Sequence, residues 1–157
     1  LRERAFVISS FGKTYHCTGW KVGYAVAPPA LTAELRKVHQ YNTFCTFHPA
    51  QAAFAEMIEA DPEHYETLGA FYQEKRDRFR KQLEGTKVRP LAVPGGYFQL
   101  VDYSAVSDLE DVEFSRLLTT EHGVTGIPLS PFYETPPAGQ RLLRLCLRPT
   151  RLRLSFF

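Results

Sequence analysis

The sequence predicts an α/β protein in two parts, joined by a long helix. Near its start, short apolar strands alternate with a polar loop and helices, which is typical of an α/β domain. A long amphipathic helix follows, and beyond it short strands surround one further helix. We therefore expect residues 1–60 to be the C-terminal part of a larger domain, 61–86 a connecting helix, and 87–157 a small α+β domain.

Composition and charge exclude several classes of protein. The 157 residues are 44% hydrophobic and 23% charged, as in ordinary globular chains. The net charge of +2 is too balanced for a general nucleic-acid or membrane-surface binder. Apolar stretches fall far short of the roughly 20 residues that span a bilayer, and the first residues do not resemble a signal peptide. Three cysteines at no metal-ligand spacing predict reduced thiols, a cytoplasmic protein and no metal site.

The first part of the chain reads as strand, loop, strand and two helices. The continuous apolar run Ala5–Ile8 predicts a strand buried on both faces, followed by the polar loop Ser9–Thr14. A second strand, Val22–Ala27, is closed by two prolines, and apolar spacing then predicts helices up to His39 and over Pro49–Ala60. So few strands cannot close a two-sided core, and the chain starts without Met. We therefore expect it to be a piece of a longer protein.

The connecting helix has clear start and stop signals. Asp61 is a suitable N-cap, Pro62 suits the first helical position, Glu63 favours the first turn, and Gly85 suits the end. The pattern beyond predicts a helix over Asp111–His122, ended by glycine, and four strands: Lys87–Val93, Gly96–Tyr103, Val124–Ile127 and Arg141–Leu147.

The segment from Ser10 to Tyr24 carries the chemistry. A hydroxyl and Lys13 follow the first strand, and a second cation, Lys21, comes eight residues later between two glycines. A lysine leaving the apolar end of a strand is partly desolvated, which frees its amine to attack a carbonyl and to hold an aldehyde cofactor as a Schiff base. Ser10 and Lys21 are then suited to bind an anionic group of that cofactor.

These motifs resemble those of the class I, fold-type I pyridoxal-phosphate aminotransferases, in particular the kynurenine and methionine aminotransferase branch. Ser10-Phe11-Gly12-Lys13 is similar to the family's cofactor-attachment signature, and Gly19-Trp20-Lys21-Val22-Gly23 is similar to its phosphate-binding segment. Further resemblances run in the same order along the chain: Phe71–Asp77, Pro94–Phe98, Gly123–Pro128 and Leu143–Cys146.

The resemblance implies a fold, a cofactor and a set of roles. The fold is the C-terminal part of a pyridoxal-phosphate-dependent transferase, and the cofactor is pyridoxal 5'-phosphate. Lys13 is the Schiff-base lysine, Ser10 and Lys21 anchor the phosphate, Arg144 binds the substrate α-carboxylate, and Phe44 matches a position that reaches into a neighbouring subunit's pocket. Tyr97 and Phe98 read as core rather than site residues. The implied reaction moves an amino group between an apolar, sulfur-containing or aromatic L-amino acid and a 2-oxo acid, in a homodimer.

Two features leave alternatives open. In relatives, several cofactor-binding residues lie upstream of the position of Leu1: the partner of the cofactor's pyridine nitrogen, the partner of its phenolic oxygen, and part of the phosphate-binding site. At the other end, the tail from Arg148 departs from the family pattern, as a frameshift or a truncation would produce. Besides transamination, β-elimination from cysteine conjugates fits the same fold and cofactor. A non-catalytic fragment is the third reading, and we expect this chain alone to be inactive.

Overall fold

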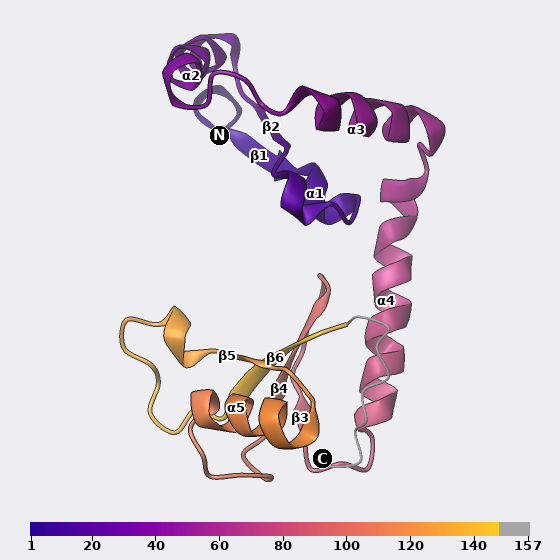
Figure 1. Ribbon diagram of the computed structural model, residues 1–157, viewed down its shortest axis with the longest axis vertical. Coiled ribbons are helices and arrows are strands. Elements are labelled where there is room, and N and C mark those ends of the chain that lie inside the picture. Colours follow the sequence, from indigo (N-terminus) through magenta and orange to yellow (C-terminus); the bar gives the residue numbers. More distant parts are fainter. Residues whose placement is uncertain (148–157) are drawn as a thin grey trace. The chain divides into compact units, whose positions relative to one another are not determined.

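The computed structural model describes residues 1–147. The chain divides into two compact units, Leu1–Leu68 and Gly69–Phe157, and the division falls within one long helix, α4 (His64–Leu83). Figure 1 shows the elements of each unit in sequence colours. Among the described residues, no helix combines the length and the apolar character needed to cross a bilayer.

Unit 1 is built on one pair of strands. After a short 3-10 turn, η1 (Arg2–Arg4), strand β1 (Val7–Ser10) pairs antiparallel with β2 (Gly23–Val26). Between them lie the short helix α1 (Phe11–Thr14) and the 3-10 turn η2 (Thr18–Trp20). Two longer helices follow, α2 (Pro29–Asn42) and α3 (His48–Ala60).

Strand β1 differs from its sequence prediction in burial. Val7 and Ile8 were expected inside a two-sided core, yet they are 61% and 78% exposed. The prediction is wrong for this chain because β2 is the strand that pairs with β1 among the described residues, and two strands cannot cover each other's faces. The predicted loop Ser9–Thr14 is also wrong: its first two residues complete β1, and the other four form α1.

Helix α4 begins at His64, two residues after Pro62, the first helical position that the capping signals predicted. The backbone N–H of Asp61 donates to the carbonyl of Met57 at 3.0 Å, so Asp61 ends α3. A turn then leads to His64, where α4 starts. A residue with good N-cap chemistry therefore serves here as the end of the preceding helix.

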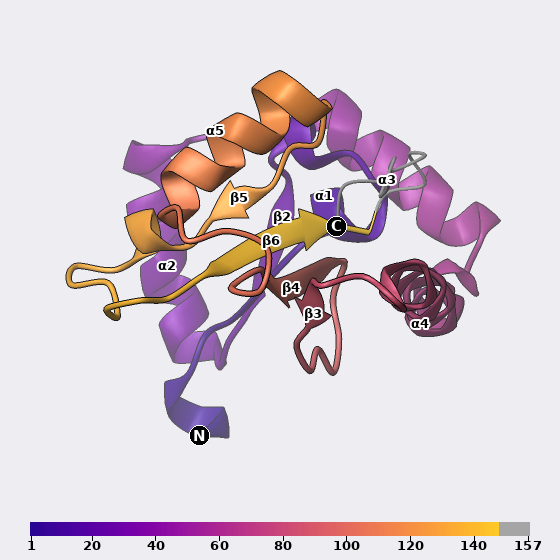
Figure 2. The ribbon, with the colours of Figure 1, turned by 90° about the horizontal axis from the view of Figure 1, so that it is seen from below.

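Unit 2 is a four-stranded antiparallel sheet covered on one face. The strand order is β3 (Arg89–Pro90), β4 (Phe98–Asp102), β6 (Leu142–Cys146) and β5 (Ile127–Pro128). Figure 2 shows helix α5 (Asp111–His122) running alongside β5 and β6. The structure confirms that Gly123 ends α5, since it adopts the left-handed conformation at φ 65°.

The alternation of side chains decides which face of this sheet is core. In β4 and β6, every second residue is buried, and the apolar ones among them, Val101, Leu143 and Leu145, pack with α5 and with the end of α4. The buried cluster consists of Phe79, Leu83, Val88, Val101, Tyr103, Phe114, Leu118, Leu143, Leu145 and Leu147. The other residues of the two strands, including Arg144, lie on the opposite face.

Candidate active site

Strand pairing in unit 1 brings three predicted site residues to one end of the strands. Ser10, the last residue of β1, pairs with Gly23, the first residue of β2. Lys13 lies three residues after Ser10 on α1, and Lys21 lies two residues before Gly23. The hydroxyl oxygen of Ser10 accepts a hydrogen bond from the backbone N–H of Gly12 at 3.2 Å, which caps α1. The end of β1 and the segment that leads from it to β2 therefore hold a hydroxyl and two lysines.

Two glycines in this segment are required by close backbone contacts. A Cβ on Gly12 would lie 3.0 Å from the Cα of Thr18, whose hydroxyl donates to the carbonyl of Gly12 at 3.3 Å. A Cβ on Gly23 would come closer to the carbonyl oxygen of Ser9 than real Cβ atoms approach any atom. The glycines of both motifs thus allow the backbone around Lys13 and Lys21 to fold tightly.

An aromatic cluster fixes the segment to the rest of unit 1. The rings of Phe11 and Phe54 stack with centroids 5.3 Å apart, and buried Val22 and Ala50 complete the cluster. At the end of α1, the carbonyl of Thr14 contacts Nε2 of His64 at 2.8 Å. Helices α3 and α4 therefore hold α1 in place.

The exposure of Lys13 contradicts one expectation. Ser10, Lys13 and Lys21 are all exposed in the described chain. The prediction that Lys13 is desolvated as it leaves a buried strand is wrong here, because β1 itself is exposed. Any desolvation of this amine must come from groups that the described residues do not supply.

Unusual backbone geometry coincides with two of the predicted site residues. Outside glycine, the described residues with positive φ are His16 at 58°, Lys21 at 54° and Phe44 at 63°. Such conformations cost about 1–3 kcal/mol and cluster at functional sites. Phe44 lies in the turn after α2, where its N–H donates to the carbonyl of His39 at 2.8 Å, and its side chain is 78% exposed.

Arg144 lies in unit 2, on the sheet face opposite the core. Its strand neighbours in the register are Leu100 on β4 and Ile127 on β5. The guanidinium carbon is 4.3 Å from the ring centroid of Phe98 and 5.3 Å from that of Phe132. A cation thus stands on a largely apolar, half-buried surface.

One donor of Arg144 is buried without a hydrogen-bond partner. Among residues 1–147, no acceptor lies within bonding distance of its Nε, and that atom is hidden from solvent. A buried donor left unpaired costs about 1–3 kcal/mol, so such a group is suited to receive an acceptor from a ligand. A carboxylate matches the planar fork of a guanidinium.

The two rings against Arg144 were not found by sequence reasoning. Phe98 was expected in the core, but it lies half-buried on the Arg144 face of β4. Period-two alternation along Phe98–Asp102 would have placed Phe98 and Leu100 on one face. The position of Phe132 in the 3-10 turn η3 (Ser130–Phe132) depends on tertiary contacts and leaves no comparable signal.

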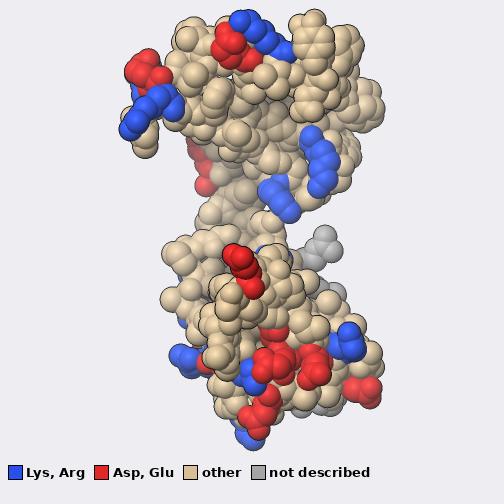
Figure 3. Space-filling model, turned by 90° about the vertical axis from the view of Figure 1, so that its left-hand side faces the viewer, with Lys and Arg blue, Asp and Glu red and all other residues tan. Residues whose placement is uncertain are grey.

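Surface charge agrees with the balanced composition. On the face shown in Figure 3, blue Lys and Arg side chains are scattered, and several red Asp and Glu side chains gather in the lower part of the view.

The fold and these motifs define a family. The model for aminotransferases of class I and II matches residues 2–154. The chain therefore belongs to the class I and II aminotransferases, whose class I members use pyridoxal 5'-phosphate.

Within this family, the chain is similar to methionine and kynurenine aminotransferases. The chain is 58% identical over 146 residues to a methionine aminotransferase of Escherichia coli. The matched region covers 93% of this chain and 38% of that protein. It is 34% identical over 149 residues to a kynurenine–oxoglutarate transaminase of Dictyostelium discoideum, covering 83% and 34%. The solved structure of a methionine aminotransferase from Escherichia coli matches with a TM-score of 0.88 and 57% identity, over 94% of this chain and 38% of that one. The chain thus spans little more than a third of the length of these relatives.

Proposed function

We propose that the full-length protein is a pyridoxal-phosphate-dependent aminotransferase that moves an amino group between an L-amino acid and a 2-oxo acid. Its preferred amino acids are apolar, sulfur-containing or aromatic. Support comes from family membership and from the similarity to methionine and kynurenine aminotransferases.

The observation that carries this proposal is the environment of Arg144. Its guanidinium lies against two aromatic rings, and its buried Nε–H has no hydrogen-bond partner within residues 1–147. Both substrates of a transamination are α-carboxylates, and a bidentate carboxylate would satisfy this group. The surrounding surface, with Leu100, Phe98 and Phe132, favours apolar over charged substrate side chains.

The residues of unit 1 fit the cofactor by their chemistry. The aldehyde of the cofactor reacts with a primary amine, and Lys13 provides one. Its phosphate binds hydroxyl and cationic donors, and Ser10 and Lys21 provide these at one end of the strand pair. When bound, the cofactor supplies an electron-accepting ring next to the substrate. Lys13 would move a proton to and from the substrate α-carbon.

The remaining proposals concern organisation. We propose that residues 1–60 are the C-terminal part of the large cofactor-binding domain, 61–86 the interdomain helix and 87–157 the small domain, whose atypical tail from 148 lies outside the described residues. The compact units that meet within α4 support this division. A homodimer with Phe44 at the neighbouring subunit's site accounts for a strained, exposed aromatic. Three free cysteines support a cytoplasmic location.

The test is steady-state kinetics of the full-length protein with methionine, phenylalanine and aspartate as amino donors. We expect methionine and phenylalanine to turn over faster than aspartate. Replacing Arg144 by Lys should raise the KM for methionine roughly 10- to 100-fold, because a point charge replaces a bidentate fork. Arg116→Lys, an exposed arginine on α5, is the matched control and should leave KM unchanged.

Two outcomes would contradict the proposal. Faster turnover of aspartate would refute the apolar specificity. Turnover of a cysteine conjugate that needs no oxo acid and releases pyruvate, without transamination, would assign the protein to the β-lyase reaction instead.

A further inference from the structure

We infer that Asp111 is a positioning residue for substrate binding, because its carboxylate holds the turn that keeps Phe132 against Arg144. The inference rests on the proposed role of Arg144 and extends it by naming the groups that shape the site around the guanidinium.

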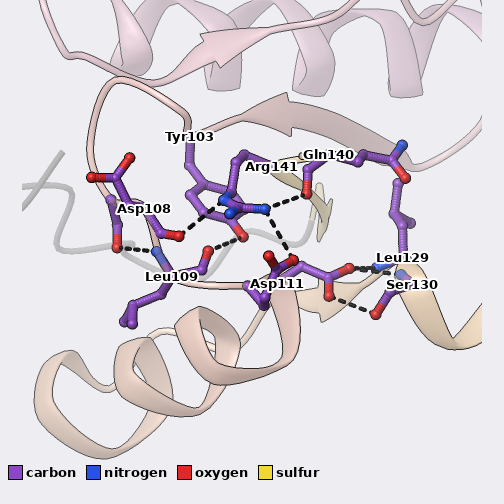
Figure 4. Close-up of polar contacts among 10 residues, drawn as sticks. Tyr103, Asp108, Leu109, Asp111, Leu129, Ser130, Gln140 and Arg141 are labelled. Atoms are coloured by element: carbon purple, nitrogen blue, oxygen red, sulfur yellow. Dashed lines mark hydrogen bonds and ion pairs between the residues drawn. The ribbon is translucent and has the colours of Figure 1, made fainter. Parts of the chain in front are cut away.

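The carboxylate of Asp111 is buried and tied to one turn. Asp111 is the first residue of α5 and is 3% exposed. Its Oδ2 accepts hydrogen bonds from the backbone N–H groups of Leu129 at 2.7 Å and Ser130 at 2.6 Å, and its Oδ1 accepts one from the Ser130 hydroxyl at 2.6 Å. Figure 4 shows these contacts converging on the one carboxylate. Three short bonds to two adjacent residues fix the turn to the start of α5.

The hydrogen bonds also keep this group ionised. Burial by itself raises the pKa of the Asp111 carboxyl, but the donors of Ser130 and Leu129 outweigh burial, and the pKa lies below its ordinary value. At neutral pH the turn is therefore held by charge-assisted bonds.

The start of α5 is itself anchored to the sheet. The hydroxyl of Tyr103, fully buried beside β4, donates to the carbonyl of Leu109 at 3.0 Å. Arg141, which precedes β6, donates to the carbonyl of Asp108 at 3.2 Å and pairs with Glu110 at 3.0 Å (Figure 4). Asp111 is thus fixed relative to the strand that carries Arg144.

The turn controls where Phe132 lies. The turn follows β5, in which Ile127 pairs with Arg144. Phe132 comes two residues after Ser130, at the end of η3, and its ring lies against the guanidinium of Arg144. Phe132 is 66% exposed, so burial of its own side chain does little to hold it there. Its position depends instead on η3, where the Phe132 N–H donates to the carbonyl of Leu129 at 3.0 Å.

The ring contributes to carboxylate binding through solvation. The ring of Phe132 excludes water from one side of the guanidinium and restricts the orientation of this planar group. The attraction between the guanidinium and a bound carboxylate is stronger where there is less water around them. Releasing the turn should therefore weaken the binding of carboxylates even though Arg144 itself is unchanged.

The experiment measures the dissociation constant of 3-phenylpropionate, an unreactive carboxylate with an apolar tail, by calorimetry on the full-length, cofactor-loaded protein. We expect Asp111→Ala and Phe132→Ala each to weaken binding about 2- to 30-fold. The double variant should bind no more weakly than the weaker-binding single variant, because both substitutions remove the same contact. Asp108→Ala, an exposed acid three residues earlier, is the matched control and should bind as the wild type does.

Conservative replacement separates hydrogen bonding from charge. Asn at position 111 can still accept from both backbone N–H groups and donate to the Ser130 hydroxyl, so Asp111→Asn should bind within about twofold of wild type. Amide exchange gives a readout that is independent of binding: the N–H groups of Leu129 and Ser130 should lose protection in Asp111→Ala and keep more of it in Asp111→Asn, which retains an acceptor for both. If Asp111→Ala does not fold, Ser130→Ala enters the same cycle with Phe132→Ala.

The possible failures are distinct. Effects of Asp111→Ala and Phe132→Ala that multiply in the double variant, or an Asn variant that binds as weakly as the Ala variant, would overturn the inference. If Arg144→Lys leaves the binding of 3-phenylpropionate unchanged, the proposed role of Arg144 fails, and the inference fails with it for that separate reason.

Discussion

Lys13 and Arg144 differ in how much of their surroundings this chain provides. Arg144 has strand neighbours on both sides and two aromatic rings against its guanidinium. Lys13 lies on a short helix whose backbone is fixed, while its side chain is exposed. The chain thus builds the proposed carboxylate site more completely than the proposed cofactor site.

At the residue scale, we predict that Lys13 carries the cofactor. Borohydride reduction of the full-length holoenzyme should attach the cofactor covalently to the peptide that contains Lys13, and Lys13→Ala should abolish this attachment, because a primary amine is required. Peptide mass mapping is the measurement. Lys21→Ala is the control: it should weaken cofactor binding yet leave the label on Lys13. A label found on Lys21 in the wild type would refute the assignment.

At the scale of elements, strand pairing places the cofactor residues. Ser10 and Gly23 are register partners, so the end of β1 and the start of β2 bring the two motifs together. Gly23→Ala should destabilise the full-length protein by about 1–3 kcal/mol, because its Cβ would overlap the carbonyl of Ser9. Urea unfolding followed by loss of cofactor absorbance measures the change.

Gly19→Ala is the matched control for this strand contact. A Cβ at position 19 meets no atom within 4 Å, so the change should stay within about 0.5 kcal/mol. Equal effects of the two substitutions would show that close backbone approach does not matter at Gly23.

The contact between α5 and η3 predicts a pH dependence of stability. Because the folded pKa of Asp111 is lowered, this carboxylate contributes stability that is fully present above its unfolded pKa of about 3.9 and is lost as pH falls through the folded pKa. Asp111→Asn should be less stable than wild type by about 1–3 kcal/mol at pH 7, and this difference should shrink in acid. Urea unfolding at a series of pH values from 7 to about 2 measures it.

The exposed acid Asp108 provides the comparison, since Asp108→Asn makes the same change of charge outside this contact. A difference between wild type and Asp111→Asn that stays constant with pH would contradict the prediction.

At the scale of the whole molecule, the two units differ in the size of their buried hydrophobic cluster. Among residues 1–147, unit 2 buries ten residues in one cluster, whereas the buried cluster of unit 1 holds three: Val22, Ala50 and Phe54. Exposed apolar strand residues such as Val7, Ile8 and Val26 leave unit 1 prone to aggregation. Net stability is only about 5–15 kcal/mol, so missing burial of this extent decides whether a unit folds.

We therefore predict that the 157-residue chain, expressed alone, is inactive and protected from amide exchange mainly in unit 2. Residues 96–147 should exchange slowly and residues 5–27 quickly, because the latter are largely exposed. Hydrogen exchange with mass spectrometry gives the comparison within one sample. Slow exchange in both regions, a cooperative melt and measurable transamination would show that the chain is self-sufficient.

Local sequence was enough to determine most elements, their order and the family. Capping and spacing signals are local, so helices over Asp111–His122 and Pro49–Ala60, and the end of α5 at Gly123, were predicted within a residue or so. The motifs around Lys13 and Arg144 were likewise found because a family signature is a run of adjacent residues.

Only the tertiary structure decided burial and the contacts between distant residues. The apolar run at Val7 and Ile8 suits a buried strand, but burial depends on what covers it, and in the described chain little does. Phe132 meets Arg144, and Asp111 meets Ser130, across separations that no local pattern records. These hydrogen bonds and ring contacts join residues that are distant in the sequence. Which distant residues come together is determined by how the helices and strands of the whole unit pack.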